Sequence, residues 1–286
     1  MERLYEYKDR DFYLHHTRSE RPDPESSTFS MQLHDKNELY YCISGRGTFL
    51  VEGQPYELLS GMVMILRAGE AHSLHIQPDE PYERITLLFS PRVLDGAENA
   101  ALLLTPYRER SLGRDNCFLP EEFSSAHVRT CLDEMLRGGS DAERRLSILS
   151  NLPAVLSHLR RVWAGERHAT PETAPGIAGE IAAYINEHLS DEWDLGTLEA
   201  ALHRNRDYLN RRFREAMGSS IWDYTVHKRI AAARQDILEG YPIGEVFEKS
   251  GFRDYSTFYR HYKAVTGVSP SGEGRARGAF CRTSAK

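Results

Sequence analysis

The feature that most constrains the fold of this chain is a helical pattern that occurs twice in its C-terminal third. A short apolar helix, a turn and a polar helix are predicted over residues 195–217, and the same order recurs 48 residues later over 243–266. One long apolar stripe, which runs from Trp222 to Ile237, joins the two copies. Two helices joined by a short turn form the helix-turn-helix motif. The sequence therefore predicts an all-α region with two such motifs in tandem.

The second helix of each motif carries basic and hydrogen-bonding side chains opposite its apolar side. Arg and Asn can each form two hydrogen bonds to a base edge in the major groove, and Arg also binds phosphate. A solvated basic face is the alternative for one such helix, but two at matching positions favour double-stranded DNA as the partner. The predicted DNA contacts are Asn205, Arg206, Asn210, Arg211 and Arg214 in the first motif and Arg253, Tyr255, Ser256 and Arg260 in the second.

The charge of the chain is unevenly distributed. The formal net charge is −6, but residues 176–286 carry 16 Lys and Arg against 15 Asp and Glu, which leaves 20 against 27 for residues 1–175. The segment 203–214 alone holds five Arg and one Asp. Because local patches rather than net charge decide nucleic-acid binding, the acidic total does not exclude DNA.

The two motifs resemble the AraC/XylS family of transcriptional regulators over residues 177–270. The resemblance rests on the segments "DYLNRRFREAMGSSIWDYTVHKRIAAARQDIL" and "IGEVFEKSGFRDYSTFYRHYKAVTGVSP". It implies a sequence-specific DNA-binding transcription regulator, with RNA polymerase as a candidate partner. The positions that match the family's signature are Arg229-Ile230, Gly251-Phe252, Asp254, Thr266-Gly267 and Ser269-Pro270.

Four positions depart from that family's pattern. Glu199 and Phe247 stand in the short helices where the family carries a small residue, while Thr257 and Tyr262 replace a usual Tyr and Phe. A charged group and a large ring at the first two positions would spread the short helices apart. A regulator that has lost DNA binding is therefore an alternative prediction.

Residues 29–90 have the pattern of short strands and turns. The aromatic and β-branched segments "ELYYCI" and "GTFLV" flank the turn sequence "SGRG", and "ERITLLF" alternates apolar residues on one face. Several short strands at this spacing predict an antiparallel barrel. The predicted fold class is thus α+β multidomain, with an N-terminal antiparallel β-barrel and a C-terminal all-α tandem helix-turn-helix domain.

The stretch from Leu33 to His72 resembles the cupin-type sensor domain found on many such regulators. Metal-binding cupins supply His-x-His and a later Glu from one motif, and a His from a second motif. Here Gln32 stands at the first His position, followed by His34 and Glu38, and His72 matches the second motif. Because this ligand set is incomplete, no metal and no cofactor are predicted. An open three-ligand metal site and a purely structural, hydrogen-bonded role are the alternatives.

We expect this barrel to bind a small-molecule effector. A few directed polar groups in an apolar cavity suit a polyhydroxylated ligand, and the resemblance to sugar-responsive regulators makes a carbohydrate the candidate. The competing class is a cupin-type metal-dependent enzyme with an accessory helical domain. Gln32 disfavours that class, so the chain is predicted not to be an enzyme. The predicted effector-binding residues are His34, Glu38, Tyr40, His72 and Arg84.

Composition and periodicity also predict how the chain is divided into domains and connecting segments. The predicted parts are a sensor over 1–97, a helical dimerisation segment over 98–165, a linker over 166–176, the DNA-binding domain over 177–270 and a disordered tail over 271–286.

A homodimer is expected through the amphipathic helix that contains Leu146, Leu149, Val155, Leu156 and Leu159, although these residues could equally cover the barrel.

No apolar run reaches the roughly 20 residues of a membrane helix, and the start lacks the pattern of a secretory signal. The four cysteines form no Cys-x-x-Cys pair. A cytoplasmic protein without membrane contact is expected.

Overall fold

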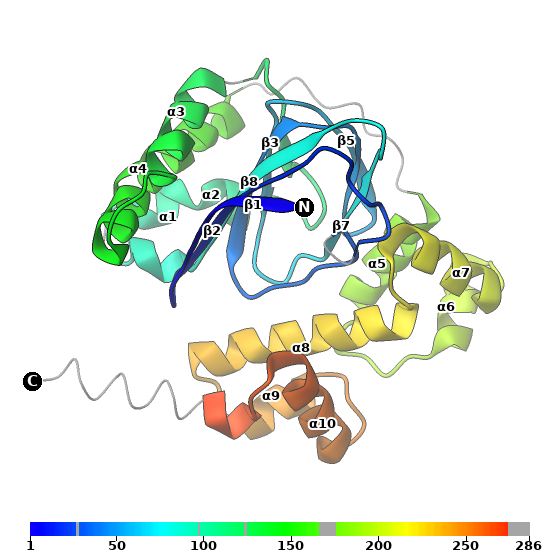
Figure 1. Cartoon of the computed structure of the whole chain (residues 1–286). Coiled ribbons are helices and arrows are strands. Elements are labelled where there is room, and N and C mark those ends of the chain that lie inside the picture. The colour runs from blue at the N-terminus through cyan, green and yellow to red at the C-terminus, as the bar shows by residue number, and fades with distance from the viewer. Residues whose placement is uncertain (27–28, 97, 123–124, 166–175, 274–286) are drawn as a thin grey trace, which may run out of the picture. The chain divides into compact units, whose positions relative to one another are not determined.

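The computed structural model describes residues 1–26, 29–96, 98–122, 125–165 and 176–273 (Figure 1). The chain divides into two compact units, Met1–Ala174 (unit 1) and Pro175–Lys286 (unit 2). The division falls within the predicted linker, of which residues 166–175 lie outside the described ranges. No helix among the described residues is long and apolar enough to cross a membrane.

Unit 1 contains two antiparallel sheets. The larger has the strand order β1-β2-β8-β3-β6-β9 and the smaller has the order β5-β4-β7. These sheets confirm the predicted antiparallel β domain, although the described strands do not close into one hydrogen-bonded ring. The strands are β1 (Glu2–Lys8), β2 (Phe12–Ser19), β3 (Asn37–Ser44), β4 (Gly47–Val51), β5 (Gln54–Leu58), β6 (Val63–Leu66), β7 (His72–Ile76), β8 (Tyr82–Phe89) and β9 (Cys117–Phe118).

The larger sheet is buried on both faces because each of its central strands alternates between two cores. In β3, Leu39 and Tyr41 belong to one core, whereas Tyr40 and Cys42 belong to the other. The first core lies against the helices, and the second lies against the smaller sheet. The turn between β3 and β4 requires glycine, since Gly45 has φ +131 and a Cβ there would lie 2.8 Å from the ring of Tyr82.

The helices of unit 1 cover the first of these faces (Figure 1). They are the 3₁₀ turn η1 (Pro91–Leu94) and the helices α1 (Ala100–Leu103), α2 (Thr105–Arg108), α3 (Ser125–Met135) and α4 (Asp141–Ala164). Helix α4 begins with a capping box between Ser140 and Glu143.

Most of the apolar residues predicted to form the dimer contact lie on the side of α4 that faces the sheet. Val155, Leu156 and Leu159 are buried in the core that α4 shares with the strands, and Leu149 packs against it. Leu146 is 64% exposed. Of the two expectations for these residues, the structure therefore favours a cover for the sheet, and only the outer side of α4 is left for contact with a second copy.

Unit 2 consists of helices and contains the two predicted helix-turn-helix motifs. The helix α8 (Ile221–Glu239) joins the pair α6 (Leu195–Leu202) and α7 (Arg206–Met217) to the pair α9 (Ile243–Lys249) and α10 (Tyr255–Thr266), and α5 (Ile177–Glu187) precedes them. Asn205 caps α7 by accepting a hydrogen bond from the Asp207 amide, and Gly218 ends it at φ +69, both as predicted.

The segment between α5 and α6 is tied to the turn of the second motif by one buried cation, Arg229 of α8. Its guanidinium donates to the backbone carbonyls of Leu189 (2.9 Å), Asp191 (2.6 Å) and Gly251 (2.6 Å). Gly251 lies in the turn of the second motif at φ +72, and a Cβ there would come within 2.8 Å of the guanidinium. The approach of Arg229 therefore needs glycine at this position.

The segment that follows the second motif is ordered, at least at its start. Glu273 is buried, and its carboxylate accepts hydrogen bonds from the Arg234 side chain (2.7 Å) and the Tyr262 hydroxyl. The prediction of a disordered tail from residue 271 is therefore wrong for 271–273, because composition does not reveal a partner for a single carboxylate. Residues 274–286 lie outside the described ranges.

Replacing Glu273 with Ala should destabilise unit 2, because it removes the acceptor of the buried Tyr262 hydroxyl and one partner of the Arg234 guanidinium. We expect a loss of about 1–3 kcal/mol, or roughly 5- to 150-fold in the protection of α10 amides from hydrogen exchange. The matched control is Glu248→Ala, which removes an exposed carboxylate. Equal protection in both variants would show that Glu273 does not stabilise this unit.

Candidate DNA interface and effector site

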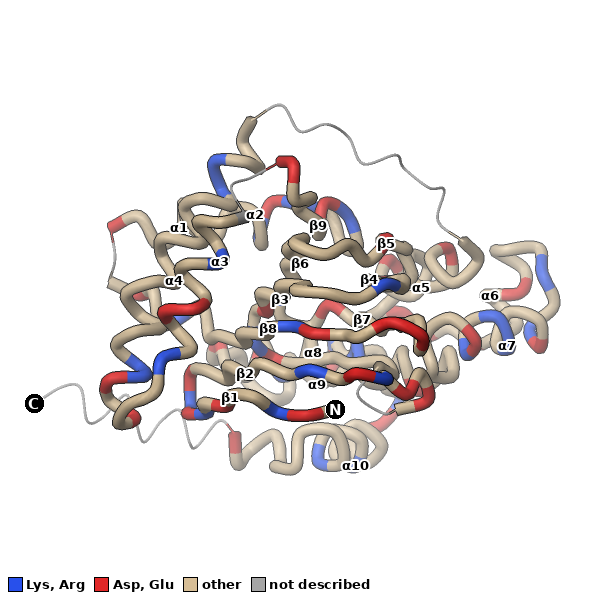
Figure 2. Tube along the Cα trace, turned by 45° about the horizontal axis from the view of Figure 1, so that its top comes forward, with Lys and Arg blue, Asp and Glu red and all other residues tan. Residues whose placement is uncertain are grey.

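Helix α7 presents a basic outer side. Leu209, Phe213 and Met217 are buried, whereas Arg206, Arg211 and Arg214 are exposed. Figure 2 shows basic residues along this helix. Arg212 also lies on the surface, but its guanidinium pairs with Glu215 at 2.7 Å. The structure thus leaves the three predicted arginines of α7 accessible to DNA.

Asn210 occupies a different environment from these arginines. It is half-buried, and its side-chain oxygen accepts a hydrogen bond of 3.1 Å from the Ile221 amide at the start of α8. A bidentate contact to adenine uses both the oxygen and the nitrogen of the side-chain amide, and the oxygen can accept a second hydrogen bond. The bond to the Ile221 amide therefore fixes the orientation in which the Asn210 amide would meet a base.

Helix α10 presents three of the four predicted residues of the second motif, and the fourth lies just before it. Asp254 caps the helix by accepting from the Thr257 amide at 2.8 Å. Tyr255, Ser256 and Arg260 are exposed on the first turns. Arg253 precedes the cap, is 83% exposed at its side chain and lies 3.7 Å from the Glu192 carboxylate.

The two short helices accommodate the residues that depart from the family's pattern there, Glu199 in α6 and Phe247 in α9. Glu199 is only half-buried on α6, so its carboxylate keeps access to water. Phe247 of α9 packs edge-on against Tyr255 at 5.6 Å and near Phe258 at 5.8 Å. Both short helices form with these residues in place, so neither residue disrupts its motif.

Unit 1 contains a cavity of about 360 Å³, within the size range of small-molecule sites. Of the predicted effector residues, His34, Glu38 and Arg84 line it. His72 and Tyr40 do not, although His72 contacts the Glu38 carboxylate at 3.3 Å. The lining residues are Met1, Arg3, Tyr13, His15, Thr17, Gln32, His34, Glu38, Arg84, Thr86 and Leu88.

Strands β2 and β8 build most of this wall. Their antiparallel register pairs Thr17 with Arg84 and His15 with Thr86, so that all four side chains lie on the same face. The sequence prediction included only Arg84. The signal for the others is the alternation around Leu14, which is buried on the opposite side.

Several polar atoms of the cavity wall are buried without a hydrogen-bond partner. They are Nδ1 of His15, the hydroxyl oxygens of Thr17 and Thr86, and Nε of Arg84. Burial, with the nearby Arg84 charge, lowers the pKa of His15 to about 4, so this imidazole is neutral at pH 7. Buried polar groups are normally paired, and unpaired ones facing a cavity are available to a ligand.

Arg84 is the only one of these residues that carries a full charge. It is 9% exposed and donates to the Tyr82 hydroxyl at 3.2 Å, and that hydroxyl is 2.9 Å from the Tyr40 hydroxyl. The guanidinium forms no ion pair with a carboxylate of the described residues. Tyr40 is therefore a buried support for Arg84 through Tyr82, which corrects its predicted place in the cavity.

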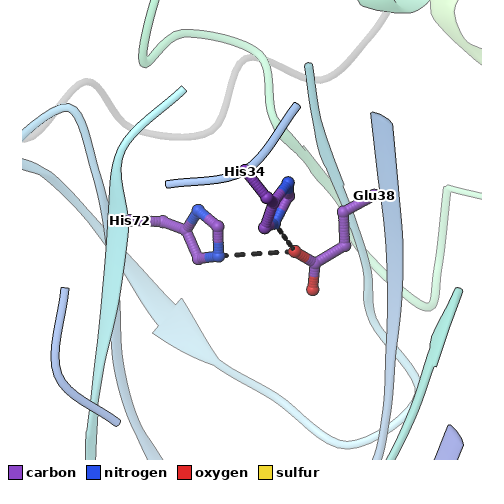
Figure 3. Close-up of side chains that lie close together, drawn as sticks. All are labelled: His34, Glu38 and His72. Atoms are coloured by element: carbon purple, nitrogen blue, oxygen red, sulfur yellow. Dashed lines mark hydrogen bonds and ion pairs between the residues drawn. The ribbon is translucent and has the colours of Figure 1, made fainter. Parts of the chain in front are cut away.

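His34, Glu38 and His72 come together at one end of the cavity (Figure 3). A carboxylate oxygen of Glu38 lies 2.7 Å from Nε2 of His34 and 3.3 Å from Nε2 of His72. Burial alone would raise the pKa of Glu38, but the two imidazoles outweigh it and hold this pKa well below its usual range. Burial likewise would lower the pKa of His72, and Glu38 raises it instead.

Each of the two units matches the model of a known protein family. A model of the AraC-like ligand binding domain matches residues 14–155, and a helix-turn-helix domain model matches residues 198–275. The chain belongs to the AraC family of transcriptional regulators. This membership confirms the resemblance in the two motifs and assigns effector binding to unit 1 and DNA binding to unit 2.

Individual AraC-family relatives are distant. The arabinose operon regulatory protein of Escherichia coli (strain K12) is 26% identical over 234 residues, which are 80% of this chain and 77% of that protein. The uncharacterized regulator YisR of Bacillus subtilis (strain 168) is 27% identical over 132 residues, or 46% of this chain and less than half (44%) of YisR. The solved structure of ToxT from Vibrio cholerae is 16% identical, with 92% of this chain and 96% of ToxT covered and a TM-score of 0.35.

Two substitutions of Asn210 separate its structural contact from a contact with bases. Asn210→Ala removes the acceptor of the Ile221 amide and should destabilise unit 2 by about 1–3 kcal/mol. Asn210→Asp keeps an acceptor oxygen and should retain most of that stability. Urea unfolding followed by far-ultraviolet circular dichroism measures both. If Asn210→Ala is as stable as the unmodified chain, the contact to Ile221 does not orient α8.

Proposed function

We propose that this AraC-family regulator acts in the cytoplasm, is not an enzyme, and changes its binding to DNA when a small effector occupies the cavity of unit 1. The observation that carries the proposal is the set of unpartnered polar atoms on the wall of that cavity. An effector alters DNA binding only if it has unequal affinity for two arrangements of the chain.

The effector that best fits this wall carries both hydroxyl groups and an anionic group. The hydroxyls of Thr17 and Thr86 and the neutral imidazole of His15 can donate to and accept from hydroxyl groups. The guanidinium of Arg84 lacks a carboxylate partner, and a carboxylate or phosphate group can form paired hydrogen bonds with it. An acidic carbohydrate supplies both kinds of group. The E. coli relative named for the arabinose operon supports a carbohydrate as well.

For DNA, we propose that both helix-turn-helix motifs of one chain contact the same face of the duplex. Arg206, Arg211 and Arg214 of α7 would contact bases and phosphates of one segment. Helix α8 has 19 residues and is about 28 Å long, close to the roughly 34 Å of one turn of DNA. The second segment would be contacted by Arg253, Tyr255, Ser256 and Arg260.

We also propose a homodimer, with RNA polymerase as a further partner of the DNA-bound form. A dimer doubles the number of DNA-binding helices, and linking two weak sites raises the overall affinity. Leu146 on the outer side of α4 is the most exposed large hydrophobic residue of the predicted segment 98–165 among the described residues. The family membership of the chain is compatible with both partners.

The charge of Arg84 should determine which effectors bind. We expect hexuronates to bind the unmodified protein more tightly than the corresponding neutral hexoses. Arg84→Met should weaken hexuronate binding by about 1.5–3 kcal/mol, or roughly 10- to 150-fold, because it removes charge-assisted hydrogen bonds. Arg84→Lys keeps the charge and should lose less. Isothermal titration calorimetry on the full chain measures each affinity.

The control for these variants is Arg46→Met, which removes an exposed guanidinium from the turn before β4. It should leave the affinities unchanged. Hexoses that bind as tightly as hexuronates, with no effect of Arg84→Met, would exclude an anionic effector. Failure of both sugar classes to bind would remove the carbohydrate from the proposal.

For DNA binding, Arg211→Ala should cost about 1–3 kcal/mol on the region upstream of the protein's own gene, as expected for lost base contacts. Arg212→Ala is the matched control, because Arg212 is already paired with Glu215. Arg214→Ala should weaken binding to all sequences alike and reduce the salt slope by about one. Fluorescence anisotropy at several salt concentrations distinguishes these results, and equal losses for Arg211→Ala and Arg212→Ala would contradict the assigned roles.

A further inference from the structure

We infer that Asp207 of α7 is a specificity-determining residue that accepts a hydrogen bond from the amino group of a cytosine in the major groove. The inference rests on the proposed contact of α7 with bases, and it names part of the DNA sequence that this helix recognises. It starts from the one acidic side chain among the five arginines of the segment 203–214.

Asp207 lies on the same side of α7 as two of the arginines proposed to contact DNA. An α-helix has about 3.6 residues per turn, so residues four and seven positions apart share a face. Arg211 and Arg214 follow Asp207 at these two spacings, and all three residues are exposed. Leu209 and Phe213 are buried on another side of the helix. The carboxylate of Asp207 therefore faces the surface that Arg211 and Arg214 contact.

Asp207 also belongs to the first turn of α7. Asn205 caps the helix by accepting a hydrogen bond of 2.9 Å from the Asp207 amide. In a helix-turn-helix motif the N-terminal residues of the second helix contact base edges. A side chain in this turn is therefore directed at bases when the helix binds as proposed.

The carboxylate of Asp207 is open even though an arginine is near. An acidic residue four positions before an arginine has a favourable spacing for an ion pair on a helix. Arg211 has this spacing, but its guanidinium lies over the ring of Tyr208, 5.9 Å from the ring centre. Among the described residues, the Asp207 side chain forms no hydrogen bond and no ion pair. The other acidic residue of α7, Glu215, is paired with Arg212 at 2.7 Å.

The chemistry of a carboxylate restricts which base it can contact. An ionised carboxylate only accepts hydrogen bonds, and the phosphates of DNA repel it. In the major groove the base donors are the amino groups of cytosine and adenine. Adenine places the acceptor N7 beside its amino group, whereas cytosine has no acceptor on this edge. Asp207 should therefore favour cytosine.

This cytosine should lie close to a guanine that Arg211 contacts. Arg forms two hydrogen bonds to the O6 and N7 acceptors of guanine. Four residues span about 6 Å along a helix, and successive bases are roughly 3.4 Å apart, so the two side chains reach bases within about two steps of each other. The DNA segment bound by α7 should therefore contain a cytosine within about two base pairs of a guanine.

The test selects binding sequences from a random pool of duplex DNA with the full chain. The positions whose base preference is lost in Arg211→Ala identify the segment bound by α7. Within it, the unmodified chain should prefer cytosine at one position by roughly 5- to 150-fold over other bases. Asp207→Asn should change that preference to adenine, because an amide both accepts from and donates to the adenine edge. Asp207→Ala should remove the preference.

Glu215→Gln is the matched control, since it neutralises the other exposed acid of α7 and should leave every selected base unchanged. A melting curve establishes that each variant folds. An acid in the first turn also stabilises a helix, and a role limited to this effect would lower the stability of Asp207→Asn without changing the selected bases. That result would overturn the inference.

Two further results would also overturn it. One is a selected α7 segment without a preferred cytosine, and the other is a change at the same position in Glu215→Gln. If the unmodified chain selects no sequence at all, the proposed contact of α7 with bases fails and the inference fails with it. A chain that selects a sequence without regard to Asp207 leaves the proposed function intact, so the two failures are distinguishable.

Discussion

A charge that is removed from water must be matched inside the protein, and this constraint determines how both units of the chain are built. In unit 2 the guanidinium of Arg229 is matched by three backbone carbonyls, two from the segment between α5 and α6 and one from the turn of the second helix-turn-helix motif. In unit 1 the fully buried side chains of Glu70 and Arg110 pair with each other, and Glu70 also accepts from the Gly113 amide. Each of these groups joins segments that are far apart in the sequence, so losing one partner would leave a buried charge unpaired.

Around the cavity, some buried polar and charged side chains lack such a matching partner. Arg84 is buried with a hydroxyl partner but without a carboxylate, and the hydroxyls of Thr17 and Thr86 are buried without a hydrogen-bond partner. Proteins tolerate such departures where function requires them. Arg84 therefore marks the place where a bound effector would complete the structure, whereas His34, Glu38 and His72 match one another. His15, Thr17 and Thr86 add neutral hydrogen-bonding groups to the cavity wall beside Arg84.

The sequence predicted the parts of the fold that depend on local patterns. The tandem motifs, the cap at Asn205 and the glycine at Gly218 follow from helical periodicity and capping preferences, and the structure contains them. The pairing of β2 with β8 brings together residues about 70 apart along the chain, and no local pattern indicates it. Thr17 and Thr86 were missed in the site for that reason. The contact of Asn210 with the Ile221 amide and the burial of Glu273 were not predicted, because their partners lie in other segments.

The central claim is that one chain contacts DNA through both of its helix-turn-helix motifs. Hydroxyl-radical footprinting of the full chain on the region upstream of its own gene tests it most directly. Two protected patches on one face of the duplex, about 10 base pairs apart, are the predicted result. In the Arg260→Ala variant the patch that belongs to α10 should fade while the other remains. No protection at any accessible concentration, or a single patch that Arg260→Ala leaves unchanged, would contradict the account.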